Sequence, residues 1–133
     1  VAGAGMKYLE QFKEKRFFMF LHFSDPDTKG HGFGEGSSEY EKALVTCDEQ
    51  AGRVINKLKE LGIYGKTAIY ITADHGFDKR KNDHKNAPEI FLAATDPSIK
   101  KNGIQSDITP TILKYFCLDL TKLEPVLPGI PLN

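Results

Sequence analysis

The sequence predicts an α/β protein with a mostly parallel sheet sandwiched by helices. Two apolar runs of strand length, Phe17–Phe23 and Thr67–Thr72, and a third run, Glu89–Ala94, which follows a proline, read as strands. Helical patterns precede the first run, separate it from the second and follow the third. Strands that alternate with helices are typical of a parallel sheet. Nearly unbroken apolar runs are typical of strands that are covered on both faces.

The bulk composition predicts one soluble domain spanning residues 1–133. Hydrophobic residues make up 40% and charged residues 27%, and the formal net charge is +0, so no electrostatic nucleic-acid surface is expected. No apolar run reaches the roughly 18 residues of a membrane-spanning helix. Because the chain starts at Val1 and not at Met, we expect a processed product or an excised piece of a longer protein. Cys47 and Cys117 lack metal-ligand spacing and read as buried small hydrophobes, although a disulfide between them stays open.

Two helices are predicted in the first half of the chain. Apolar residues at helical spacing indicate a short amphipathic helix from about Met6 to Arg16. Ser38 is the expected cap of a long helix, with Glu41 as its capping-box partner and Gly62 as its C-cap.

The remaining segments are predicted as loops, one further helix and an irregular tail. Ser24–Ser37 is rich in Gly and Asp and is expected to be a loop, as is the polar segment Phe77–Lys85. A helix is expected to begin near Ile108, and the proline-rich tail from Leu118 is expected to be an irregular strap.

Carboxylates and imidazoles follow the predicted strands. Asp27 and His31 come after the first strand, Asp74 and His75 directly after the second, and His84 shortly before the third. Right-handed crossovers would bring these loops to one edge of a parallel sheet. Carboxylate oxygen and imidazole nitrogen together suit zinc, with manganese or iron as competitors. The adjacent pair Asp74-His75 alone, or the spacing of Asp27 and His31 alone, is a weak signal for a metal site. Both in this order, followed by a His before the third strand, are much more specific. Two groups of ligands suggest two metals about 3.5–4 Å apart, an arrangement suited to in-line displacement at phosphorus.

With these residues in place, the chain resembles the alkaline phosphatase superfamily, most closely its type I phosphodiesterase and nucleotide pyrophosphatase branch. Cofactor-independent phosphoglycerate mutases and sulfatases are related branches. The resemblance extends from about Phe17 to Leu120 and implies an alkaline-phosphatase-like fold. Four stretches carry it: Phe20–His31, Ile69–Gly76, His84–Pro88 and Asp107–Leu113.

The resemblance implies a ligand set. Asp27, His31 and His84 would bind one metal, and Asp74 and His75 would bind the other. Two zinc ions are implied, with manganese as the alternative. The family's Thr or Ser nucleophile and a further Asp ligand lie on an N-terminal segment, and no such pattern precedes Asp27 here. The chain therefore looks like the C-terminal portion of such an enzyme, with no nucleophile of its own and an incomplete second metal site.

The predicted function is metal-dependent hydrolysis of phosphate mono- or diesters by the parent enzyme, with a small-molecule phosphate ester as substrate and no turnover by this chain alone. The missing nucleophile motivates an alternative, a truncated non-catalytic metal-binding or interaction module. A phosphosugar mutase is a further alternative, but it would need an inserted substrate domain. We also expect dimerisation or low solubility of a sheet truncated at one edge. The family resemblance favours a secreted or periplasmic location, whereas the mutases are cytosolic.

Overall fold

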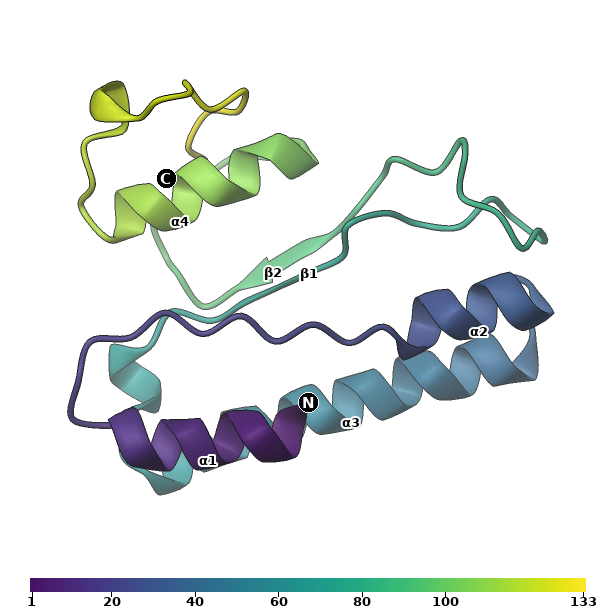
Figure 1. The fold of residues 1–133 in the computed structure, drawn as a ribbon, viewed down its shortest axis with the longest axis horizontal. Helices are drawn as coiled ribbons and strands as arrows, with labels where there is room; N and C mark the ends of the chain where they lie inside the picture. The colour runs from purple at the N-terminus through teal and green to yellow at the C-terminus, as the bar shows by residue number, and fades with distance from the viewer. The chain divides into compact units, whose positions relative to one another are not determined.

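The computed structural model describes all 133 residues as an α/β protein with four α-helices and a two-stranded sheet (Figure 1). The chain forms two compact units, Val1–Ala68 with Phe77–Ala87, and Ile69–Gly76 with Pro88–Asn133. No helix combines the length and the apolar character that a membrane crossing requires. In chain order the elements are α1 (Ala2–Phe12), α2 (Asp25–Phe33), α3 (Ser38–Glu60), the 3-10 turn η1 (Tyr64–Lys66), β1 (Tyr70–Thr72), β2 (Leu92–Ala94), η2 (Gln105–Asp107), α4 (Ile108–Tyr115) and η3 (Leu120–Lys122).

The first unit is built on the long helix α3, against which α1 and α2 pack (Figure 1). The cap of α3 is Ser37, one residue before the predicted one, and its side chain accepts a hydrogen bond from the Tyr40 amide at 3.2 Å. Leu9 of α1 and Ala43 and Leu58 of α3 are buried and belong to the core of this unit.

The glycine-rich segment predicted as a loop is the helix α2 instead. Pro26 stands in its first turn, where the missing amide costs no hydrogen bond. Asp25 and Asp27 in the same turn complement the positive end of the helix dipole. Gly34 ends the helix with φ of 92°, a conformation that favours glycine. The abundance of glycine outweighed these start signals in the prediction.

The run Phe17–Phe23 is extended but is not a strand of the sheet. Its side chains alternate between half-buried and exposed, and Phe20 is 77% exposed. Leu21 reaches α1, where a Cβ on Gly5 would lie 3.0 Å from its Cδ2 atom. The expectation of a strand covered on both faces is therefore wrong, because helix packing covers one face of an extended chain.

In the second unit, β1 and β2 pair antiparallel, with Ile71 opposite Ala93. The sequence predicts a mostly parallel sheet, and the observed pair differs from that prediction. Parallel neighbours need a long crossover, usually a helix, whereas antiparallel neighbours do not. The segment between β1 and β2 contains no helix, so it returns the chain without such a crossover.

The tail of the second unit is held against the start of α4. Asp107 accepts hydrogen bonds from the Ile104 amide at 2.9 Å and the Ile130 amide at 2.8 Å. The Thr111 hydroxyl donates to the Asp107 carbonyl at 2.6 Å and accepts from the Leu132 amide at 2.9 Å. Apart from η3, the tail is the irregular strap that its prolines predict.

Candidate metal centre

Asp27 and His31 lie one turn apart on α2, so both side chains stand on the same face of the helix. The His31 Nε2 atom is 3.3 Å from the Asp27 Oδ1 atom, and both side chains are about half exposed, at 45% and 46%. The helix, and not a strand end as predicted, brings these two groups together.

The other ring nitrogen of His31 fixes its tautomer. His31 Nδ1 lies 2.8 Å from the carbonyl oxygen of Asn82. A carbonyl only accepts hydrogen bonds, so Nδ1 carries the proton, and a neutral ring presents a lone pair on Nε2 toward Asp27. Two such acceptors at this distance attract one another only with a proton or a cation between them. A backbone carbonyl behind a histidine is also the usual support of a metal-binding imidazole.

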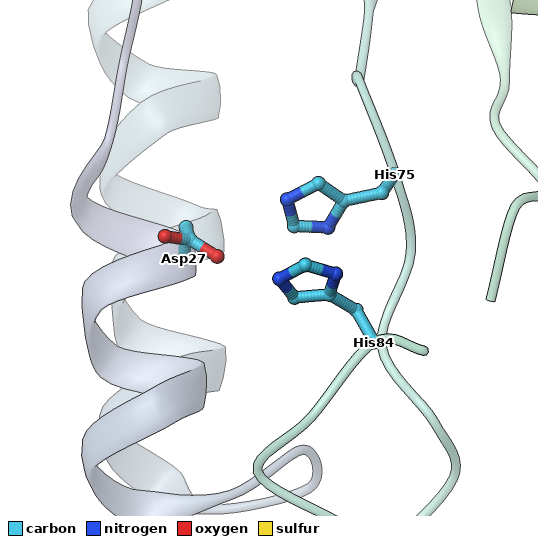
Figure 2. Close-up of side chains that lie close together, drawn as sticks. All are labelled: Asp27, His75 and His84. Carbon is cyan, nitrogen blue, oxygen red and sulfur yellow. The ribbon is translucent and has the colours of Figure 1, made fainter. Parts of the chain in front are cut away.

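His84 reaches the same site from the segment Phe77–Ala87. A ring nitrogen of His84 lies within 4.8 Å of a carboxylate oxygen of Asp27, and Figure 2 shows the two side chains. The His84 ring centroid is 5.0 Å from that of His31. Of the three residues predicted as ligands of the first metal, Asp27 therefore lies close to His31 and to His84 within the first unit, and the two histidine rings are neighbours.

An aromatic ring supports the two histidines. Phe77 makes edge contacts with His31 and His84, at centroid distances of 5.2 Å and 5.7 Å, and with Tyr40 at 5.5 Å. Gly30 lies against this ring, because an added Cβ would stand 2.6 Å from Phe77 Cε2. Nothing in the sequence points to Phe77, since an aromatic residue in a polar loop carries no periodic signal.

Two carboxylates act on the Tyr40 phenol beside this site. Burial, together with the charges of Glu35 and Asp27, raises the pKa of the Tyr40 phenol above its ordinary value. A divalent cation would neutralise this charge. One carboxylate and two imidazoles, as Asp27, His31 and His84 provide, form a donor set that fits a transition metal of the zinc type.

Asp74 and His75 belong to the second unit, where they follow β1. Their side chains approach each other, with His75 Nε2 at 3.8 Å from Asp74 Oδ2. His75 Nδ1 lies 2.9 Å from the carbonyl oxygen of Gly76, and Gln105 donates to the Asp74 carbonyl at 2.7 Å. Because β1 ends at Thr72, the pair escapes the strand alternation that would turn adjacent side chains to opposite faces. His75 is the third side chain drawn in Figure 2.

The family model described as type I phosphodiesterase / nucleotide pyrophosphatase matches residues 3–115. The chain belongs to this family. The matched range contains all five predicted ligands, and it confirms the family resemblance drawn from the motifs. Proteins of this family depend on metals, and the ligand atoms of Asp27 and His84 agree with that dependence.

Curated relatives come from two of the three branches named above, the phosphodiesterases and the phosphoglycerate mutases. A 2,3-bisphosphoglycerate-independent phosphoglycerate mutase of Clostridium kluyveri is 29% identical over 122 residues, which are 83% of this chain and 23% of the relative. The bis(5'-adenosyl)-triphosphatase ENPP4 of Bos taurus is 29% identical over 85% of this chain and 21% of the relative. Venom phosphodiesterase 2 of Crotalus adamanteus is 35% identical over 77% of this chain and 14% of the relative. The chain thus spans less than a quarter of the length of each of these relatives.

Proposed function

We propose that the whole protein hydrolyses phosphate mono- or diesters at two bound divalent metals. In this proposal Asp27, His31 and His84 hold one metal, and Asp74 and His75 contribute to the other. The observation that carries it is the proximity of Asp27 to His31 and to His84 in a chain that belongs to a phosphodiesterase family.

Each residue of the first group has a definite task. The Asp27 carboxylate brings the negative charge that balances a cation, and His31 and His84 bring neutral donors. The Asn82 carbonyl keeps His31 in the tautomer whose Nε2 atom faces the Asp27 carboxylate. The bound metal would polarise a phosphoryl oxygen and lower the pKa of a coordinated water or hydroxyl.

Chain connectivity limits how far the backbone of His75 can lie from that of Phe77. His75 precedes Phe77 by two residues, so their Cα atoms can stand at most about 7 Å apart in any arrangement of the two units. Phe77 contacts both His31 and His84. On this basis we propose that His75 contributes to a second group of ligands.

The nucleophile is expected to lie outside this chain, as is the Asp that would complete the second metal site. This chain would then be the C-terminal portion of the domain, binding metal without turning over substrate. Its coverage of less than a quarter of each of those relatives is compatible with a chain that is one part of such an enzyme. We further propose a secreted or periplasmic location, supported by the venom origin in the name of one relative.

A phosphosugar mutase is the second candidate, because phosphoglycerate mutases are among the relatives. Both candidates would transfer a phosphoryl group whose charge the metals would neutralise, and they differ in the acceptor, which would be water in a hydrolase. The whole protein, supplied with a phosphate ester, would release inorganic phosphate or a nucleotide monoester as a hydrolase, and would return an isomeric ester as a mutase.

Elemental analysis of the purified chain tests the metal proposal. We expect bound zinc in the wild-type chain, lost in Asp27→Ala and retained in Asp25→Ala. Asp25 is an exposed acidic residue of the same helix turn, so the control matches the loss of charge. Asp74→Ala should remove only metal of the second site. Equal zinc in wild type and Asp27→Ala would show that the first site is not the one proposed.

A further inference from the structure

The segment that carries His84 is closed at its base by a carboxylate. Residues 78–86, here called the His84 loop, begin at Asp78 and end at Asn86. The Asp78 carboxylate accepts one hydrogen bond from the Asn86 amide and a second from the Asn86 side chain, both at 3.1 Å. Only 9% of the Asp78 side chain is exposed, although most of the loop faces solvent.

The backbone of the same residue holds the interior of the loop. The Asp78 amide donates to the Asp83 carbonyl at 2.9 Å, and the Lys81 amide donates to the Asp78 carbonyl at 2.9 Å. Three kinds of group on Asp78, its carboxylate, amide and carbonyl, therefore determine the course of the nine-residue loop. Lys81 Nζ is the nearest cation to the carboxylate, at 3.7 Å.

The loop is also fastened to the end of α2. The Glu35 amide donates to the Lys81 carbonyl at 2.7 Å, and the Glu35 carboxylate accepts from the Arg80 amide at 2.7 Å. Arg80 adopts a φ of 60°, a backbone conformation that side chains other than glycine rarely take. The loop therefore keeps one particular shape against α2, even though it contains no regular secondary structure.

Both histidines of the candidate metal centre depend on this shape. His84 is a member of the loop, two residues before Asn86. His31 lies on α2, but its Nδ1 atom is held by the carbonyl of Asn82, another member of the loop. A change at the base of the loop would move one imidazole and release the support of the other.

We propose that Asp78 is a positioning residue for the metal centre, which acts through the His84 loop and binds no metal itself. The inference rests on the metal site proposed above. Ordering a free backbone costs conformational entropy at each residue. Because Asp78 orders the loop before the metal binds, metal binding does not include this entropy cost. Without Asp78, the metal itself would have to order the loop.

Two substitutions distinguish the positioning role of Asp78 from an effect of its negative charge. Asp78→Ala removes both acceptors and leaves the Asn86 amide without its partner. Asp78→Asn keeps the bridge, because an amide oxygen accepts from the Asn86 backbone and the amide nitrogen donates to the rotated Asn86 side chain. The matched control is Asp119→Ala, which removes a similar double acceptor, the one that binds the Thr121 amide and hydroxyl in the second unit.

The test is zinc affinity of the 133-residue chain, measured by competition with a chromophoric chelator. We expect Asp78→Ala to weaken zinc binding about 10- to 100-fold, the usual effect of losing a group that supports a ligand. Asp78→Asn and Asp119→Ala should stay within about threefold of wild type. An Asp78→Ala chain with wild-type affinity would overturn the proposal. Equal losses in Asp78→Asn and Asp78→Ala would also overturn it, because they would assign the effect to charge or to direct ligation.

Hydrogen exchange of the metal-free chain distinguishes failure of this inference from failure of the metal site. The Glu35 amide, bonded to the Lys81 carbonyl, should exchange faster in Asp78→Ala and at the wild-type rate in Asp27→Ala. Unchanged exchange in Asp78→Ala would refute control of the loop by Asp78, whatever the metal does. A wild-type chain that binds no zinc would overturn the metal site and this role together, even with faster exchange in Asp78→Ala.

Discussion

Replacing Gly30 by alanine tests whether Phe77 packs between α2 and the two histidines. Gly30 is buried on α2, one residue before His31. An added Cβ would lie 2.6 Å from Cε2 and 2.9 Å from Cε1 of the Phe77 ring, closer than real Cβ atoms approach other atoms. The ring cannot turn aside freely, because Tyr40 and His84 contact it as well.

The expected change in the free energy of unfolding of Gly30→Ala follows from two opposing contributions. Gly to Ala inside a helix gains about 0.5–1 kcal/mol through reduced backbone entropy of the unfolded chain. Overpacking against a confined ring costs about 1–3 kcal/mol. Gly32 provides the matched control, since it lies on the same helix and an added Cβ there would meet nothing within 4 Å. The control receives the gain without the cost, so the two variants should differ by about 1–3 kcal/mol in the free energy of unfolding.

Equilibrium urea unfolding of the metal-free chain measures this difference. We expect Gly32→Ala to be slightly more stable than wild type and Gly30→Ala to be less stable than Gly32→Ala. Zinc affinity should fall in Gly30→Ala alone, because a displaced Phe77 ring moves against His31 and His84. Equal stabilisation by both substitutions would refute the packing of Phe77 on Gly30 and with it the described support of the site.

The sequence predicts the grouping of Asp27, His31 and His84, but by a route that the structure does not follow. The prediction places Asp27 and His31 after a strand and His84 before another, in loops at one edge of a parallel sheet. In the structure, Asp27 and His31 share a face because α2 is helical and they are four residues apart. A spacing of four is compatible with a loop or a helix, and the glycines favoured the loop. The local signals at Asp25 and Pro26 were the ones that decided the structure.

Side-chain patterns could not reveal the groups that support the site. The Asn82 carbonyl is a backbone atom, and any residue type provides one at that position. Asp78 is one of several charged residues in a polar loop, and only tertiary structure shows that its carboxylate is covered. The antiparallel pairing of β1 and β2 is likewise decided by how the chain returns between them, which strand periodicity does not encode.

Two further predictions concern the strap that covers the start of α4. Gly129→Ala would place a Cβ in collision with the Ser106 carbonyl, so the free energy of unfolding should fall by about 1–3 kcal/mol. The control is Gly65→Ala, whose Cβ meets no atom within 4 Å and which should be close to neutral. Urea unfolding measures both variants. The second prediction is a pH dependence. Hydrogen bonds from the Ile104 and then the Ile130 amides hold the pKa of Asp107 below its usual range. A carboxyl whose pKa is lower in the folded than in the unfolded state contributes stability that is complete well above its unfolded pKa of about 3.9. That contribution is lost as the pH falls through the folded value. The free energy of unfolding of wild type should therefore decrease more steeply below about pH 4 than that of Asp107→Asn, which cannot titrate there. Parallel decreases in the two chains would show that the strap is not held by an ionised Asp107.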